Sequence, residues 1–211
     1  MNMKKLILIL FLFSSSSCFS QDLLQIDSSG RKLKDYYLSL NVENLWLAGH
    51  HVNWETGEPD KPESKEGIKT HCSAFVASAC KGVSIYILRP PEHGQVLLSN
   101  AQYDWLYGKK SSKEGWREIK ENKYSIAQQY ANDGYIVIAA IKNPDDSKAG
   151  HIALVMPFET DINTLNENGP ELIQAGTVNS SSISLKEGFK QHLKKWPEDE
   201  VVFFFNESKP F

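Results

Sequence analysis

The sequence lacks the long apolar and basic stretches that would point to membranes or nucleic acids. After residue 20 no apolar run is long enough to cross a bilayer, so we expect no integral membrane span. No basic run is interleaved with aromatic residues, and the formal net charge is −3 with a pI near 6.1. These features give no reason to expect a nucleic-acid partner. The chain also lacks internal repeats, and it lacks low-complexity segments beyond its first twenty residues.

The first twenty residues predict export. Two lysines precede an unbroken apolar run, Leu6 to Phe13, and small residues stand at positions −3 and −1 of a cut before Gln21. Because the run is too short for a permanent anchor, residues 1–20 are predicted to be a signal peptide. The rest, 21–211, fits one domain in the periplasm or outside the cell. Cys18 allows an alternative, lipidation, which the three serines before it disfavour.

Cysteine is scarce, and its spacing is informative. After the predicted cleavage only Cys72 and Cys80 are left. Two cysteines in an exported protein are expected to pair if they can. Eight residues of helix separate their Cα atoms by about 12 Å, whereas a disulfide requires about 7 Å or less. The sequence therefore predicts at least one free thiol outside the cytosol.

The order of predicted elements is helices first and strands afterwards, which is typical of the α+β class. Helices are expected over residues 21–40, 72–82, 96–107 and 125–133. Strands are expected over 135–141, 151–156, 171–175 and 201–205, with a short strand or turn at 115–119. Residues 43–69 are rich in glycine, proline and charge and are predicted to form a surface loop, a feature that is often functional when long.

Cys72 and His151 together could perform nucleophilic catalysis. Cys72 begins a predicted helix, where the backbone N–H groups and the helix dipole favour a thiolate. A free cysteine is more often a core residue, which is our interpretation of Cys80. His151 opens a predicted strand and titrates near neutrality, so it could accept the thiol proton and return it. Either residue alone is weak evidence, but the pair is what Cys–His catalysis requires.

A third residue is needed to hold the imidazole in one tautomer. Gln174 is the best candidate, because it lies in the strand after the histidine strand. If these strands are antiparallel neighbours, both side chains can lie on one face. Glu171 and Asn179 are alternatives, and a glutamine that simply faces solvent is an equally common outcome.

Three segments resemble the NlpC/P60 and CHAP families of peptidoglycan hydrolases. Residues 70–76, Thr-His-Cys-Ser-Ala-Phe-Val, resemble their nucleophile segment, whose usual form is Asp-Cys-Ser-Gly-Phe-Val. Residues 150–155, Gly-His-Ile-Ala-Leu-Val, resemble their histidine strand. Residues 172–176, Leu-Ile-Gln-Ala-Gly, are similar to the next strand, which carries a polar orienting residue. The resemblance covers about half of the chain, and the three segments follow one another in the same order as in these families.

This resemblance implies a papain-like α+β core, with a nucleophile helix packed on an antiparallel sheet. Residues 21–69 would be an N-terminal lead-in and loop. The implied activity is hydrolysis of amide bonds in peptidoglycan peptides, with Cys72, His151 and Gln174 as a Cys–His–polar triad and no cofactor. It also leaves room for an inhibitor or immunity protein as a partner.

The implied substrate contacts are His71, Ser73 and Asn179. The families usually have aspartate at position 71 and glycine at position 74, where this chain has His71 and Ala74. Because both positions lie near the substrate in these families, the cleaved bond is open.

Two other functions and a metal site are alternatives. A cysteine protease or acyltransferase acting on proteins or lipids would have an apolar cleft around Trp46 and Trp54. A non-catalytic cell-wall-binding or inhibitory protein on the same fold would not bring the three triad residues together. The His50-His51 pair would need two more metal ligands, and Asp60 and Glu63 are supported by composition alone, so no metal is expected.

Overall fold

The computed structural model describes residues 23–61, 70–193 and 201–211. The predicted signal peptide, including Cys18, lies outside these ranges, as does Glu63. Within the described ranges, none of the helices combines the length and the apolar character that a membrane crossing requires.

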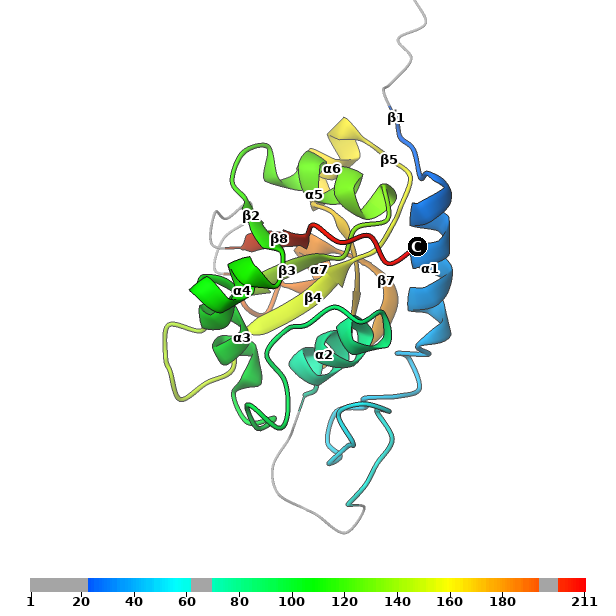
Figure 1. Ribbon diagram of the computed structural model, residues 1–211. Coiled ribbons are helices and arrows are strands. Elements are labelled where there is room, and N and C mark those ends of the chain that lie inside the picture. Colours follow the sequence, from blue (N-terminus) through cyan, green and yellow to red (C-terminus); the bar gives the residue numbers. More distant parts are fainter. Residues whose placement is uncertain (1–22, 62–69, 194–200) are drawn as a thin grey trace, which may run out of the picture.

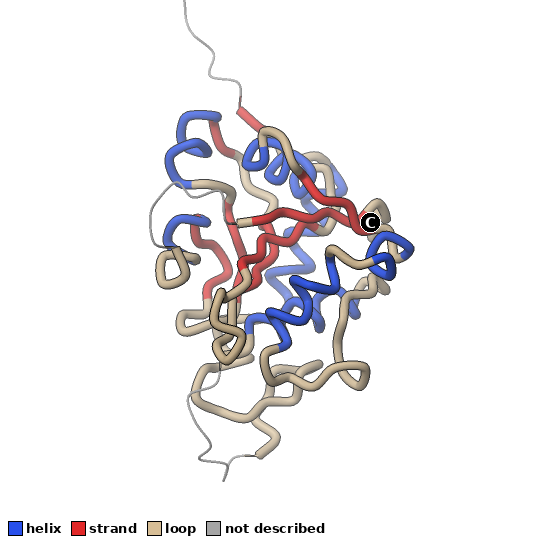
Figure 2. The backbone as a smooth tube through the Cα atoms, turned by 90° about the vertical axis from the view of Figure 1, so that its left-hand side faces the viewer, coloured by secondary structure: helices blue, strands red, loops and turns tan. Residues whose placement is uncertain are grey.

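A six-stranded antiparallel sheet forms the centre of the protein, in the order β2-β8-β3-β4-β6-β7 (Figures 1 and 2). Its strands are β2 (Trp116–Ile119), β3 (Val137–Ile141), β4 (His151–Val155), β6 (Glu171–Gln174), β7 (Ser180–Ser184) and β8 (Val202–Asn206). A separate two-stranded sheet pairs β1 (Leu23–Leu24) with β5 (Thr160–Asp161). The last strand, β8, lies between β2 and β3, so the sheet is complete only when the C-terminal region is in place.

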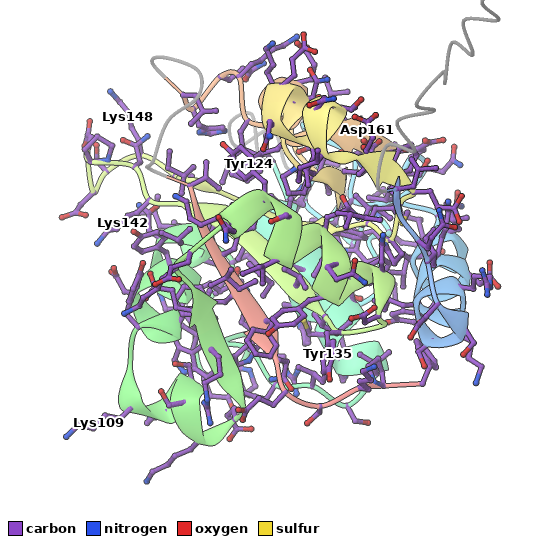
Figure 3. All side chains as sticks on the ribbon, turned by 90° about the horizontal axis from the view of Figure 1, so that it is seen from above. Lys109, Tyr124, Tyr135, Lys142, Lys148 and Asp161 are labelled. Atoms are coloured by element: carbon purple, nitrogen blue, oxygen red, sulfur yellow. The ribbon has the colours of Figure 1, made fainter. Side chains whose placement is uncertain are left out.

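Helices pack on both faces of the six-stranded sheet. They are α1 (Ser28–Ser39), α2 (Cys72–Gly82), α3 (Leu98–Leu106), α4 (Lys109–Lys113), α5 (Lys123–Asn132), α6 (Ile162–Asn168) and α7 (Leu185–Gly188). Helix α2 covers one face, and α5 and α7 cover the other; Figure 3 shows α5 lying across its face between Tyr124 and Tyr135. This arrangement confirms the predicted α+β class.

Alternation along the strands creates two hydrophobic cores. In β4, Ile152 and Leu154 pack with α2, whereas Ala153 and Val155 pack with α5 and α7. Every residue of β4 is buried, which explains why its sequence is apolar without interruption after His151. The same alternation decides on which face each side chain of the site lies.

Most predicted elements are present, and the differences have physical reasons. Helix α2 has the predicted bounds: it ends at Gly82, and Val83 is its C-cap. Strand β7 was not predicted, because its residues are mostly serine and it lies at the sheet edge, where apolar alternation is not required.

The prediction of a surface loop is partly wrong for residues 43–61. The segment has no helix or strand, but Trp46 and Val52 are only 2% and 1% exposed. The Trp46 ring packs edge-on against Phe75 of α2, with 5.3 Å between the ring centroids. This segment is therefore part of the α2 side of the core.

Candidate functional site

Cys72 is the first residue of α2 and is 4% exposed. The N-cap residue is His71, and its side chain makes no capping hydrogen bond to the first turn of the helix. The N–H groups of that turn are therefore not occupied by a capping side chain. The backbone N–H groups of Ile152 in β4, Ser73 and Cys72 itself each favour the thiolate and lower the pKa of the Cys72 thiol.

Burial and these donors act on the thiol in opposite directions. Burial raises the pKa of the Cys72 thiol above its usual value, and this effect is larger than the lowering by the three N–H groups. Cys72 is therefore a neutral thiol at neutral pH. Attack on a carbonyl would require a nearby base.

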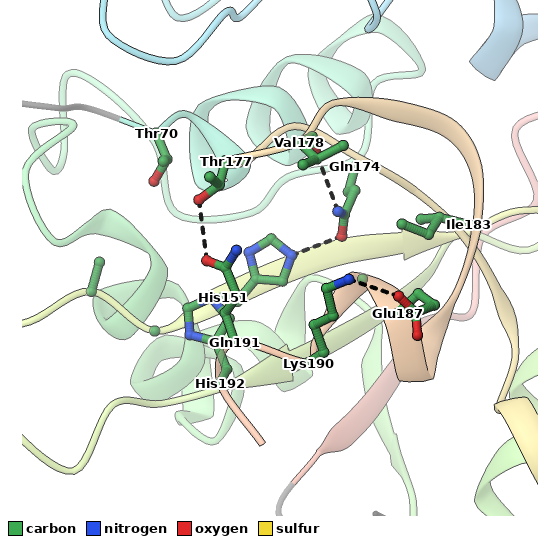
Figure 4. A pocket seen from close by; sticks show the side chains of 14 residues that line it. Thr70, His151, Gln174, Thr177, Val178, Ile183, Glu187, Lys190, Gln191 and His192 are labelled. Atoms are coloured by element: carbon green, nitrogen blue, oxygen red, sulfur yellow. Dashed lines mark hydrogen bonds and ion pairs between the residues drawn. The ribbon is translucent and has the colours of Figure 1, made fainter. Parts of the chain in front are cut away.

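His151 begins β4 and hydrogen-bonds to Gln174 at the end of β6. The distance from His151 Nε2 to Gln174 Oε1 is 2.9 Å, and Gln174 Nε2 donates to the Val178 carbonyl at 3.1 Å (Figure 4). Because β4 and β6 are antiparallel, with Leu154 opposite Ile173, both side chains lie on one face. The Val178 contact orients the amide, so its oxygen accepts from Nε2–H. The neutral ring then keeps Nδ1 as a proton acceptor.

The His151 ring is enclosed by aromatic neighbours. Phe189 lies 4.7 Å from it between centroids, and His192 stacks on it at 5.0 Å with an interplanar angle of 2°. Burial lowers the pKa of His151 to about 4; the Gln174 hydrogen bond acts in the opposite direction and the neighbouring His192 in the same direction. His151 is thus neutral, and able to accept a proton, at neutral pH.

Cys72 and His151 line adjoining pockets. The Cys72 pocket and the His151 pocket share Thr70 and Ala149 as lining residues. Strand alternation directs His151 toward the α7 side of the sheet, whereas Cys72 lies on the α2 side. Among the described residues, no hydrogen bond joins the Cys72 sulfur to the His151 ring. The two groups lie on either side of the start of β4, at one end of the sheet. The structure thus brings His151 and Gln174 together but does not bring Cys72 into contact with them, which is the outcome that the non-catalytic alternative predicts.

The predicted alternatives to Gln174 have other contacts. Glu171, at the opposite end of β6, accepts a hydrogen bond from Ser182 Oγ at 2.5 Å. Asn179 accepts from the Gly176 N–H at 2.9 Å and donates to the Val42 carbonyl at 2.7 Å. Through these hydrogen bonds Asn179 links the chain after β6 to the segment after α1, and neither of them involves His151.

The predicted substrate contacts differ in position. His71 and Ser73 both line the Cys72 pocket and are 5% and 6% exposed. His71 Nε2 donates to the His50 carbonyl at 2.8 Å, and the Ser73 carbonyl accepts from Gln102 at 3.2 Å. Asn179 is not among the residues that line either pocket.

Sequence reasoning missed two histidine contacts. His192 is partly buried against the His151 ring, a contact that was not predicted. His51, considered above only as a metal ligand, hydrogen-bonds to Asp60. No periodicity signals either contact, because both arise from chain segments without regular structure.

Comparison with known proteins identifies no family: no protein-family model matches the chain, and no curated protein is significantly similar to it in sequence. In the part of the chain that the structure describes, no three residues of the types His, Cys, Asp or Glu gather into a possible metal site. A function for this protein therefore has to be inferred from its sequence motifs and from the geometry of the site.

Proposed function

We propose that this protein is an exported cysteine amidase that hydrolyses amide bonds in peptidoglycan peptides, on a papain-like core of the NlpC/P60 and CHAP type. The observation that carries the proposal is the 2.9 Å hydrogen bond between His151 Nε2 and Gln174 Oε1, beside the pocket that contains Cys72. A buried neutral imidazole held by an amide is what a thiol at a helix start requires as its base.

Catalysis would begin with attack of Cys72 Sγ on the amide carbonyl carbon. His151 Nδ1 takes the thiol proton and can return it to the leaving nitrogen, while Gln174 keeps the ring in the required tautomer. The N–H of Cys72 supports the negative charge that develops on the carbonyl oxygen. Because the thiol and the ring lie on either side of the start of β4 and no hydrogen bond joins them, this proton transfer requires the two side chains to approach each other around the end of the strand when substrate binds.

The substrate class follows from the predicted export and from the resemblance of the three motifs. The adjoining pockets give an extended peptide two places to bind. The first contains His151 and the polar side chains of Thr177 and Gln191. The second contains Cys72 and apolar side chains such as Leu97 and Leu98. A cell-wall stem peptide has both polar and aliphatic groups.

Digestion of purified peptidoglycan tests this proposal. The wild-type protein should release peptide fragments that mass spectrometry identifies, and Cys72→Ala should release none. Cys80→Ala is the matched control, because Cys80 lies in the same helix but is fully buried away from both pockets. Equal inactivity of wild type and Cys72→Ala on every wall type tested would overturn the amidase proposal.

A further inference from the structure

The segment 43–61 holds a second histidine–carboxylate pair. His51 Nδ1 hydrogen-bonds to Asp60 Oδ1 across a hairpin-like turn. The Asp60 N–H donates to the His51 carbonyl at 3.1 Å, and Val52 and Pro59 form an isolated antiparallel bridge. Backbone contacts thus fix the two side chains opposite each other.

This turn is attached to the nucleophile helix. The His71 ring, directly before Cys72, donates to the His50 carbonyl at 2.8 Å. Ser78 of α2 donates to the Glu55 carbonyl at 2.5 Å, and Gln95 Nε2 donates to the Val52 carbonyl at 3.1 Å. With Trp46 packed on Phe75, these contacts hold the turn against α2 from several sides.

His51 and Cys72 line the same pocket, which has a volume of about 270 Å³. The other lining residues include 95–99, among which are the apolar side chains of Val96, Leu97 and Leu98. His151 lies in the adjoining pocket, on the other side of the sheet. The thiol therefore has His51 and His71 in its own pocket and His151 across the start of β4. The His71 ring bonds to a backbone carbonyl, whereas the His51 ring is held by the Asp60 carboxylate.

We propose that His51 is a second catalytic residue of the amidase: it protonates the leaving amine and then activates the hydrolytic water. This inference rests on the proposed function and divides the proton transfers between two histidines. Asp60 is a positioning residue, which holds Nδ1–H and leaves Nε2 for the substrate. The carboxylate also balances the charge of a protonated His51 ring.

The protons balance over one cycle. In acylation the S–C bond forms, His151 takes the thiol proton, and the C–N bond breaks as protonated His51 gives its proton to the amine. The enzyme then carries a thioester and a neutral His51, and His151 releases the thiol proton to solvent. In deacylation His51 takes a proton from water as the oxygen attacks the thioester carbon, and the departing Cys72 sulfur takes a proton from solvent.

An activated ester separates the two histidines. Nitrophenolate leaves without protonation, so p-nitrophenyl acetate should acylate Cys72 in a burst that requires His151 but not His51. The steady rate after the burst reports deacylation. The variants are His51→Gln, Asp60→Asn and, as a matched control, His50→Gln, whose exposed side chain does not line the pocket.

We expect His51→Gln to keep the burst rate of the wild type and to lower the steady rate by about 100-fold. Asp60→Asn should lower the steady rate less, and His50→Gln should behave as the wild type. A retained burst also shows that the variant is folded.

Three results would overturn the inference. An unchanged steady rate in His51→Gln would mean that the His51–Asp60 pair has only a structural role. Loss of the burst in His51→Gln, with the fold intact by circular dichroism, would mean that His51 serves the thiol instead. Absence of a Cys72-dependent burst in the wild type would overturn the proposed hydrolase itself, and the inference with it.

Discussion

Among single residues, His151 is the one whose chemistry depends most on its surroundings. Its ring lies between Phe189 and His192 and is held by Gln174. Burial makes protonation costly, and the amide contact fixes the tautomer. Burial thus keeps the ring neutral at neutral pH but makes it a weaker base than a free histidine, and it makes the folded protein sensitive to acid.

The free energy of unfolding should fall as the pH decreases from about 7 to 5. Folded His151 has a pKa of about 4 against 6.5 for the unfolded chain, so the unfolded state binds more protons in this interval. One such group contributes about 2 kcal/mol to the change. Urea titrations at both pH values measure it, and His151→Gln should reduce the change while the control His93→Gln should not. An identical pH dependence in His151→Gln would contradict the low pKa.

For the proposed amidase activity, Gln174→Ala should lower the turnover number by about 100-fold, because the ring loses the partner that fixes its tautomer. Glu171→Gln is the control: it lies in the same strand and contacts Ser182 instead of His151. Turnover of released peptide measures the effect. Equal turnover in both variants would remove Gln174 from the catalytic machinery.

At the scale of elements, helix α2 and the segment 43–61 act as one unit. The Trp46 N–H donates to the Gly57 carbonyl at 2.8 Å, and Gly57 has a φ of +74°. A Cβ atom at Gly57 would lie 2.4 Å from Trp46 Cδ2. The turn that carries His51 can therefore pack this closely against the Trp46 ring only if residue 57 is glycine.

Gly57→Ala should loosen this segment. Gly49→Ala is a matched control, since Gly49 also has a positive φ, +84°, but a Cβ atom there would have no neighbouring atom within 4 Å. Both variants incur backbone strain of about 1 kcal/mol, and only Gly57→Ala adds a clash with Trp46. Amide exchange at Trp46 should accelerate in Gly57→Ala alone. Similar exchange in both variants would contradict this account.

At the scale of the whole molecule, the sheet separates two differently built sides. The α2 side contains both Cys72 and Cys80, and the other side contains the His151–Gln174 pair. Both of these cysteines are free. Cys80 is completely buried, whereas Cys72 lines a pocket.

Iodoacetamide should therefore modify Cys72 in the folded protein and Cys80 only as fast as the molecule unfolds. Peptide mass spectrometry at neutral pH, with and without urea, measures the two rates. The Cys80→Ala variant should keep the Cys72 rate unchanged. Equal rates for both cysteines without urea would show that the α2 side opens far more readily than its packing indicates.

Local pattern accounts for much of this fold. The apolar run of β4 and the small residues of α2 predict these elements, because each pattern reflects the burial of the strand or helix that carries it. The hydrogen bond of Gln174 to His151 followed from the order of two strands, once they were taken as antiparallel neighbours. The elements α6, β7 and α7 were not predicted, because their short polar sequences have no periodicity to detect.

The sequence by itself determined the α+β order, the spacing that keeps the two cysteines apart and the residue types of the proposed Cys–His–amide site. These depend on spacing along the chain, such as the helical separation of Cys72 and Cys80. Only the tertiary structure decided that His151 and Cys72 lie on opposite sides of β4, and that His51, held by Asp60, lines the same pocket as Cys72. Such contacts arise where distant segments pack together, and neighbouring residues do not encode them.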